Sequence, residues 1–506
     1  MRISLVKHLS RLLALIGALT SLWFLNTNLQ PLQPALYGFV VCFIVGIFLA
    51  IAVFSDGLVA KTKDQLVKFT KQKHFVAISL AAIGAISMAI RLFFYYRFTY
   101  SPVSDPAMFF NAAKKVASGH GLHGDVYVAT YPYLAAYDNV LGVVMKAIHS
   151  PWLATILLNS VLDLLSAILL FVLLRKLTKP GSLLPIVAFT VWLLNPLNVI
   201  FSVLSLPITI VNFFIVCTML IVFMLVRHLT RLQARDALLL SVLLGIVTGY
   251  GNCFRPVFLV VFIALGIVIV SLYLTGHRSS KYLMIGVGCL VLPLIIFVGI
   301  QRLNLSFVSH EIGLHAAKNP SGVSLYVGSS WDSDGEWRPY LTDEINFICK
   351  QSFAEQKYEQ CHAILRDKSV QRYKNLGPAN LSSLFIRKLY HQAGLQNYFY
   401  NAHQSLLDYS KSKTAKMLNV YSAIYLAALF ALSTRYLYGF AKRPSTDHVA
   451  NATLLFAILI LLGWFFSFMV VEAAPRYSTI LYPSFTIFAV LALARNQRNK
   501  STKNTA

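Results

Sequence analysis

Charged residues are scarce in this chain, and their scarcity excludes most classes of soluble protein. Only 12% of the 506 residues are charged, whereas 57% are hydrophobic and the mean hydropathy is +0.64. A soluble domain of this length would carry about twice that charged fraction. Apolar runs of about 20 residues recur along the chain, and each is long enough to cross the hydrocarbon core of a bilayer. We therefore predict an all-α polytopic membrane protein rather than a transmembrane barrel, which would show short alternating strands.

Acidic residues are the rarer of the two signs of charge. The chain has 19 Asp and Glu against 44 Lys and Arg, which gives a net charge of +25. Such an excess could indicate nucleic-acid binding, but most of the basic residues lie in short loops between apolar runs, as the positive-inside rule expects. We therefore predict the lipid bilayer as a partner and no nucleic acid. The glycine patterns of Rossmann and Walker nucleotide sites are also missing.

Cysteine and metal-binding patterns are equally sparse. Four of the six cysteines lie within apolar runs, whereas Cys349 and Cys361 lie in one long polar segment, where a disulfide and two free thiols both stay open. No small-x-small cleavage site follows Leu25, so the first apolar run is predicted to be an uncleaved span. No protein metal site and no resident cofactor are predicted.

The alternation of basic and cation-poor loops predicts a topology. It puts both termini in the cytoplasm, with about twelve spans in a multi-pass protein of the cell membrane. Pro196 and Pro207 interrupt the region 182–226, so this region can be divided into spans in more than one way. The predicted spans are 9–27, 35–55, 75–98, 151–174, 182–200, 204–226, 237–254, 256–275, 282–300, 416–437, 450–471 and 476–494.

The same pattern predicts how the chain divides into domains. A small mixed α/β subdomain is expected outside the membrane, with helices near 343–375 and 380–392 and a turn-rich stretch at 319–336. The predicted parts are an N-terminal two-span extension with a basic loop at 1–73, a membrane core at 74–300 whose first outer loop is 100–150, the outer subdomain at 301–415, C-terminal membrane helices at 416–494 and a basic cytoplasmic tail at 495–506.

Asp105 is the most informative acid in the sequence. It follows the predicted span 75–98 by a few residues and opens a stretch, ending at Gly119, in which apolar residues recur at helical spacing. This pattern is typical of a helix lying in the membrane interface, whose N-terminal dipole would favour an ionised carboxylate. On periodicity alone, Asp105 is either a helix cap or solvated loop acid, or a catalytic base.

Other charged residues lie inside or at the ends of predicted spans. Arg91 and Asp163 fall within spans, where a charge costs about 2.5–3.5 kcal/mol and therefore requires a partner. Arg255 and Arg476 map to the outer ends of spans, where long cationic side chains also serve as simple interface anchors. Glu472 precedes Arg476 by four residues and is either a plain interfacial acid or a partner that orients this guanidinium.

Several short motifs, taken in order, resemble those of bacterial GT-C glycosyltransferases. These polytopic enzymes, of the family 39 type, include relatives of protein O-mannosyltransferases and of lipid A aminoarabinose transferases. The likeness covers most of residues 75–494 and lies outside the first two spans. The residues that carry it are Arg91, Pro102 to Asp105, Ala112, Ala113, Gly119, Tyr131, Pro132, Ser324 to Gly328, Trp337, Glu472 to Tyr477, Tyr482 and Pro483.

The resemblance implies a GT-C-like fold and a lipid-linked sugar donor. The implied activity transfers a sugar from a polyprenyl phosphate to an extracytoplasmic acceptor, which is a cell-envelope glycan, a teichoic acid, a glycolipid or a protein. Asp105 would then accept the proton of the acceptor hydroxyl in an inverting reaction. Arg476 and Arg255 would hold the leaving phosphate, since a guanidinium binds phosphate bidentately. The requirement for a divalent metal and the oligomeric state stay open.

The remaining candidate substrate-binding residues have plainer interpretations beside the functional ones. Glu472 would bind sugar hydroxyls or orient its neighbouring guanidinium, and Arg91 would neutralise a phosphate or an acid. Tyr477 and Tyr131 are either sugar platforms or packing and belt aromatics. Pro106 departs from the family pattern, because many relatives place an aromatic or acidic residue there. This departure puts a serine or threonine protein acceptor in doubt.

Two other classes of protein would also have many spans and buried charges. A lipid or sugar transporter, or a flippase, should show repeated halves and helices broken at mid-membrane, and the sequence has no internal repeat. A non-catalytic subunit for envelope assembly would tolerate the loss of Asp105. The feature that separates these alternatives from an enzyme is whether Asp105, Arg255, Glu472 and Arg476 meet at one site.

Overall fold

A computed structural model describes residues 73–180, 182–275, 279–393, 405–406, 413–442 and 447–501. The first two predicted spans, 9–27 and 35–55, lie outside the described residues, as does nearly all of the predicted N-terminal extension at 1–73.

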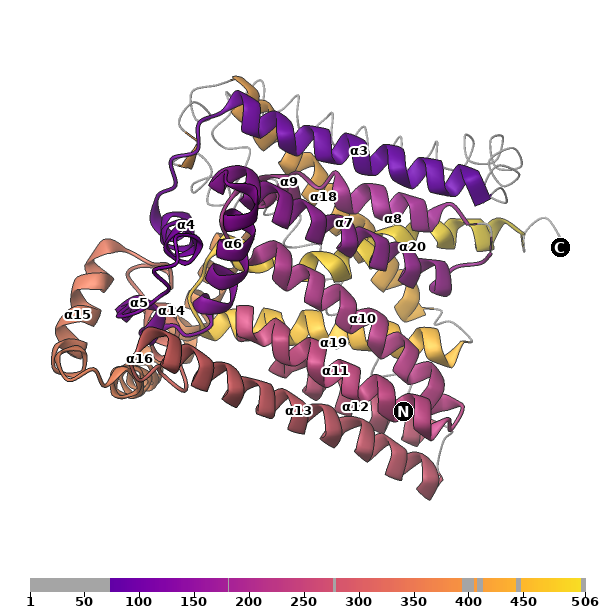
Figure 1. Ribbon diagram of the computed structural model, residues 1–506. Coiled ribbons are helices and arrows are strands. Elements are labelled where there is room, and N and C mark those ends of the chain that lie inside the picture. The colour runs from indigo at the N-terminus through magenta and orange to yellow at the C-terminus, as the bar shows by residue number, and fades with distance from the viewer. Residues whose placement is uncertain are drawn as a thin grey trace.

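Long apolar helices running side by side form the body of the molecule (Figure 1). In the described part of the chain, seven helices are long and apolar enough to cross a membrane, or up to eight if one bent pair is a single span. The chain is therefore an all-α polytopic membrane protein. The seven helices are α3 (Lys73–Arg97), α7 (Pro151–Leu177), α10 (Ile208–Thr230), α11 (Ala234–Phe254), α13 (Ser280–Ile312), α19 (His448–Val470) and the segment Arg476–Leu493. This last segment consists of most of the 3-10 helix η1 (Pro475–Leu481) and the first part of α20 (Tyr482–Ser501).

The predicted number of about twelve spans is not confirmed, and the differences have local causes. The predicted span 182–200 is a pair of short helices, α8 (Leu184–Leu193) and α9 (Pro196–Val203), bent by 45° where Pro196 begins the second one. The predicted span 256–275 is α12 (Leu259–Thr275), an apolar helix of only 17 residues. The predicted span 416–437 lies in α18 (Lys413–Lys442), a helix that is not among the seven.

Five short helices and the long helix α16, which is broken at Gly377, cover one end of the bundle, which we call the capped end. It is built from α4 (Ser104–Ala117), α5 (Val126–Thr130), α6 (Leu134–Ile148), α14 (Gly322–Gly328), α15 (Pro339–Ala354) and α16 (Tyr358–Ala393). Figure 1 shows α4 nearly along its axis, so α4 lies across the ends of the long helices. The predicted mixed α/β subdomain at 301–415 is not confirmed, because its described residues form helices and turns without a strand.

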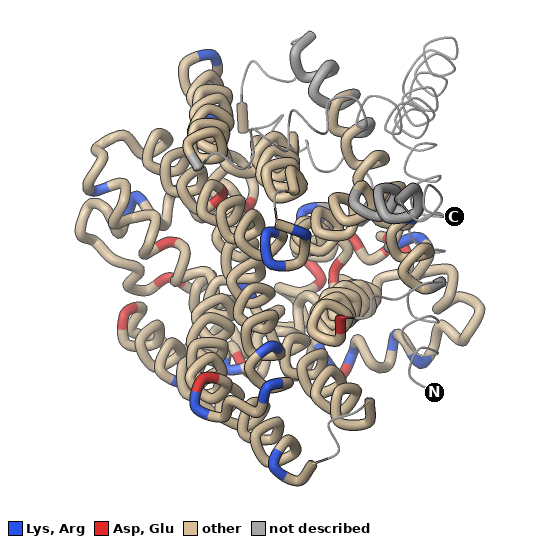
Figure 2. The backbone as a smooth tube through the Cα atoms, turned by 90° about the vertical axis from the view of Figure 1, so that its right-hand side faces the viewer, with Lys and Arg blue, Asp and Glu red and all other residues tan. Residues whose placement is uncertain are grey.

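The opposite end of the bundle carries basic loops. Figure 2 views the molecule from that side, where Lys and Arg occupy several of the helix ends that face the viewer. The basic clusters at the ends of α7 and α10 contain Arg175, Lys176, Arg227 and His228. The sequence predicts such basic loops for the cytoplasmic face of the membrane.

A buried ion pair joins α3 to α7 inside the bundle. The guanidinium of Arg91 contacts the carboxylate of Asp163, and both side chains are almost completely buried. Arg91 also donates a hydrogen bond of 2.9 Å to the hydroxyl of Ser202. Since removing one member of such a pair leaves an uncompensated buried charge, the pair fixes how these helices pack.

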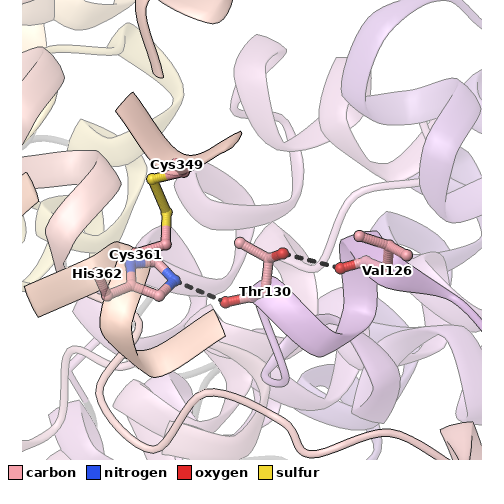
Figure 3. The surroundings of a disulfide bond; sticks show 5 residues. All are labelled: Val126, Thr130, Cys349, Cys361 and His362. Atoms are coloured by element: carbon pink, nitrogen blue, oxygen red, sulfur yellow. Dashed lines mark hydrogen bonds between the residues drawn. A yellow bond between two sulfur atoms is a disulfide. The ribbon is translucent and has the colours of Figure 1, made fainter. Parts of the chain in front are cut away.

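The capped end has an apolar core of its own, and a disulfide closes it (Figure 3). Cys349 of α15 is bonded to Cys361 of α16, so the pairing that the sequence left open is formed. His362, the next residue, is fully buried and donates from Nε2 to the carbonyl oxygen of Thr130 at 2.9 Å. Burial lowers the pKa of His362, so this ring stays neutral and ties α16 to the end of α5.

Removal of this disulfide is expected to loosen the capped end and leave the long helices folded. The double variant Cys349→Ala/Cys361→Ala should lose about 2–3 kcal/mol of local stability, because the bond closes a short loop. Limited proteolysis of the protein in detergent would detect the change as faster cleavage near residues 355–357. Dithiothreitol should reproduce this effect in the wild type and leave the double variant unaffected. Equal cleavage rates for all samples would show that the disulfide contributes nothing to the local stability of the capped end.

Candidate active site

Asp105 lies in the first turn of α4 at the capped end. Helix α4 begins after Val103, and no side chain caps its N-terminus, so Asp105 does not act as the helix cap. Its side chain is 30% exposed and points instead to Arg476. The buried face of α4 consists of Pro106, Phe109, Ala112 and Ala113, of which Phe109 and Ala113 belong to the apolar face predicted for an interfacial helix.

The start of α4 is fixed by contacts to two neighbouring elements. The hydroxyl of Ser205 donates to the carbonyl oxygen of Pro106 at 2.6 Å. The phenol oxygen of Tyr100 lies 2.7 Å from the same hydroxyl, and its ring stacks on Trp152 at a centroid distance of 5.2 Å. The backbone that carries Asp105 is thus held by the α9–α10 connection and by α7.

Arg476 joins two carboxylates. Its Nη2 lies 2.7 Å from Oδ2 of Asp105 and 3.9 Å from Oε1 of Glu472. The hydroxyl of Tyr477 donates to Oε2 of Glu472 at 3.1 Å. The side chain of Arg476 is 22% exposed, so the ion pair with Asp105 is accessible from outside the protein.

A second guanidinium completes the cluster. Helix α11 ends at Phe254, and Arg255 leaves it in an extended conformation. The guanidinium carbon of Arg255 lies 3.8 Å from the centroid of the Tyr477 ring, while that of Arg476 lies 5.2 Å from the same centroid. The Tyr477 ring therefore holds two cations at one place, stabilised by cation–π attraction.

Glu472 is oriented by main-chain contacts with α14 and the turn that follows it. After α19 ends, the backbone N–H of Glu472 donates to the carbonyl oxygen of Ser324 at 2.8 Å, and that of Ala473 donates to Gly335 at 2.7 Å. A β-carbon added to Gly328 would come within 2.5 Å of the carbonyl carbon of Val471. The backbone segments that contain Gly328 and Val471 can therefore approach this closely only with glycine at position 328.

The electrostatics of the cluster distinguish the two carboxylates. Glu472 is 7% exposed, and this burial raises the pKa of its carboxyl, an effect that Arg476 partly offsets and Asp105 reinforces. Asp105 is the more exposed of the two and has the shorter contact with a guanidinium. Asp105 is thus the carboxylate better placed to meet a molecule entering from outside.

Three tyrosines line the same region. Tyr131 makes edge-to-face contacts with Tyr127 and Tyr133, at centroid distances of 5.0 and 6.2 Å. Burial raises the pKa of all three phenols, and the charged groups Asp105, Arg476, Arg255 and Glu472 act on one or more of them. The phenols are therefore neutral and available as hydrogen-bonding groups.

The structure brings six of the seven predicted site residues together. Arg91 is the exception, since it pairs with Asp163 inside the bundle. Sequence reasoning did not single out Tyr127 and Tyr133, although both flank Tyr131 in a tyrosine-rich loop. It also missed Lys388, whose surroundings depend on contacts between distant segments. Direct contacts join Asp105, Arg255, Glu472, Arg476 and Tyr477, and Tyr131 lies near enough for Glu472 and Tyr477 to raise the pKa of its phenol.

The chemical capacity of this cluster follows from its parts. It offers an accessible carboxylate that can accept a proton and two guanidinium groups that can hold an anion. Within the described part of the chain, no group of three or more His, Cys, Asp or Glu side chains is arranged to hold a metal ion. Acid–base chemistry beside a bound anion is what these residues support.

Comparisons with known proteins add little to this description. No protein-family model matches the sequence, and no curated protein does. Among solved structures, the archaeal oligosaccharyltransferase AglB from Archaeoglobus fulgidus, in complex with an inhibitory peptide and a dolichol-phosphate, is similar with a TM-score of 0.44 and 9% sequence identity. The similarity covers 85% of this chain and 52% of that one, so this chain spans about half of its length. At this level, the similarity assigns no family and no role to any residue.

Proposed function

We propose that this chain is a membrane glycosyltransferase that moves a sugar from a polyprenyl-phosphate donor to an acceptor outside the cytoplasm. The observation that carries the proposal is the ion pair of Asp105 and Arg476, with Arg255 stacked on the adjacent Tyr477 ring, at one end of the membrane helices. A carboxylate beside two guanidinium groups suits the displacement of a phosphate by a hydroxyl. The sequence motifs that resemble GT-C glycosyltransferases support the same class.

In the proposed reaction, a hydroxyl oxygen of the acceptor attacks the anomeric carbon of the sugar. The bond from this carbon to the phosphate oxygen breaks, and the electron pair leaves with the polyprenyl phosphate. Asp105 takes the proton of the attacking hydroxyl. Because the hydroxyl attacks from the side opposite the phosphate in a single displacement, the configuration at the anomeric carbon inverts. Phosphate is a good leaving group, and no general acid is required.

Arg476 and Arg255 would stabilise the charge that develops on the leaving phosphate. A guanidinium matches phosphate oxygens bidentately, and its contribution grows in a site that excludes water. Glu472 would help to orient Arg476, because its carboxylate lies 3.9 Å from the same Nη2 atom that contacts Asp105. Tyr477 and Tyr131 would contact the sugar or its hydroxyls.

The proposed orientation places the capped end outside the cell and both termini in the cytoplasm. The basic loops at the opposite end and the disulfide between Cys349 and Cys361 support this orientation, since disulfides persist in oxidising compartments. The acceptor in this proposal is a cell-envelope glycan, a teichoic acid, a glycolipid or a protein. The donor is a substrate, and the proposal includes no resident cofactor.

The test is transfer of a labelled sugar from polyprenyl-phosphate donors in membranes that contain the protein, beside membranes from the same host without it. Runs with and without EDTA would also determine whether a divalent metal is needed. We expect label to appear in an acceptor fraction only when the protein is present. Absence of transfer with every donor would contradict the proposal and favour a transporter, a flippase or an assembly subunit. Movement of labelled lipid across vesicle membranes would then separate these alternatives.

A further inference from the structure

Lys388 is a cation buried at the capped end that the proposed reaction does not use. It lies in the second half of α16, beyond the break at Gly377, and none of its surface is exposed. Its ammonium nitrogen donates to the carbonyl oxygen of Gly328 at 2.9 Å. A fully buried lysine is costly unless its surroundings compensate for it, so its position requires an explanation.

The aliphatic part of Lys388 packs against the turn at 331–335. This turn bonds the stretch 471–474 between α19 and η1, which we call the Glu472 segment. Gly335 has a φ of +72°, and a β-carbon there would come within 2.9 Å of both Cδ and Cε of Lys388. The carbonyl oxygen of Gly335 accepts the N–H of Ala473, the residue after Glu472. Lys388 therefore packs against the same glycine whose carbonyl oxygen holds the Glu472 segment.

Arg387, the preceding residue, binds the same turn. Its Nη1 lies 2.5 Å from Oδ1 of Asp334, and its guanidinium carbon lies 3.8 Å from the centroid of the Trp331 ring. Two successive residues of α16 thus contact the turn, Arg387 at Trp331 and Asp334 and Lys388 at Gly335. The turn is in contact with both α16 and the Glu472 segment.

The charged groups around Lys388 come from three elements. They are Asp334 and Glu336 on the turn, Arg387 on its own helix, and Glu472 and Arg476 on the segment between α19 and α20. Burial lowers the pKa of Lys388 to about 7, and the negative charge of Glu472 raises it in part. The amine therefore changes its charge close to neutral pH, and Glu472 is the group to which this change is coupled.

We propose that Lys388 is a positioning residue that holds Glu472, and through it Arg476, in place by its packing on the Gly335 turn and by its charge. It touches neither the donor nor the acceptor. The inference rests on the proposed function for its effect on sugar transfer, whereas the packing of Lys388 on the turn that bonds the Glu472 segment does not depend on it. While Lys388 is charged, it attracts the carboxylate of Glu472; once Lys388 is neutral, that attraction is lost.

Thermal unfolding in detergent tests the coupling without any assay of activity. The variants are Lys388→Met, Glu472→Gln and their combination, each measured from pH 6 to pH 9. We expect the Tm changes to be non-additive by several degrees at pH 6, with the coupling much smaller at pH 9, where Lys388 is neutral in every protein. Lys368→Met, an exposed change on the same helix, should be additive with Glu472→Gln throughout. Additive Tm changes for Lys388→Met at every pH would overturn the inference.

Lys388→Met is expected to have a second effect, a change in how stability depends on pH, and the sign of this change follows from proton linkage. The unfolded chain binds a proton on Lys388 up to about pH 10.5, whereas the folded chain releases it at about pH 7. The stability of the wild type relative to Lys388→Met should therefore rise as the pH increases from 7 towards 10. Parallel curves for the two proteins would show that Lys388 does not titrate in this window.

The transfer assay then distinguishes this inference from the proposed function. Wild-type kcat/KM is expected to fall as the pH rises from 7 to 8.5, and Lys388→Met should lose this fall and be slower at pH 6.5 by about tenfold, which is the effect of about one misplaced polar contact. A merely structural role would lower activity equally at every pH and would contradict the inference. Non-additive Tm changes for Lys388→Met and Glu472→Gln, without any transfer by the wild type, would uphold the coupling of Lys388 to Glu472 and reject the proposed function.

Discussion

Asp105→Asn is expected to abolish sugar transfer while leaving the protein folded. Loss of a general base lowers kcat/KM by about 10²–10⁴-fold, because the acceptor hydroxyl then attacks without losing its proton to the enzyme. Asparagine has nearly the same shape, and the ion pair that it removes is partly exposed, so the cost in stability should be at most about 1 kcal/mol. Initial rates of label transfer at matched protein concentration would measure the effect.

The control for this variant is Asp367→Asn. Asp367 is an exposed acid on α16 at the same end of the molecule, so its substitution removes an equal charge without touching the cluster. Its transfer rate should match that of the wild type. Equal rates for Asp105→Asn and the wild type would reject the catalytic assignment, even if the chain proved to be a glycosyltransferase.

Arg476→Lys is expected to reduce transfer by about 10²–10³-fold, the loss seen when one charge-stabilising donor is removed from a transition state. Lysine keeps the positive charge but cannot form the bidentate contact that a guanidinium makes with phosphate. The effect should appear mainly in kcat, because charge on the leaving phosphate develops in the transition state.

Arg302→Lys provides the matched comparison for Arg476→Lys. Arg302 is exposed on α13, and its replacement should leave kcat and KM unchanged. A rise in KM for the donor, with kcat intact, would show that Arg476 binds substrate and transition state equally. Wild-type values of both constants for Arg476→Lys would contradict the proposed contact with phosphate.

Much of the membrane fold could be predicted from the sequence because apolar runs and basic loops are local signals. The helices α7, α10, α11 and α19 lie within a few residues of the predicted spans. Helix α13 was predicted to end near residue 300, where the apolar run stops, but it continues to Ile312. Its last turns bury Val308 and Ile312 against the capped end, and this contact was invisible in a hydropathy pattern.

The capped end was harder to predict because it mixes short helices with polar turns. Glycine and serine between residues 319 and 336 indicated turns and hence a mixed α/β subdomain, yet the described segment contains the helix α14. Gly328 is needed there for close contact between two backbone segments, its own and that of Val471, rather than for a hairpin. Spacing in the sequence does not distinguish these two uses of glycine.

The candidate site was partly predictable for a different reason. Charged residues at the ends of apolar spans are few, so Asp105, Arg255, Glu472 and Arg476 were conspicuous, and these four lie together. Lys388 was not conspicuous, because it lies in a polar helix among other charged residues, and only the fold buries it. Their proposed roles in transfer await the experiments described above.

The ion pair between Asp105 and Arg476 joins residues that lie far apart in the sequence. Asp105 leaves the ribosome long before Arg476, which lies at the start of a later membrane helix. A nascent chain therefore carries an incomplete cluster until the helix that begins at Arg476 has been inserted. A premature stop just before η1 would yield a protein that keeps Asp105, Arg255 and Glu472 but lacks the guanidinium that joins the two carboxylates.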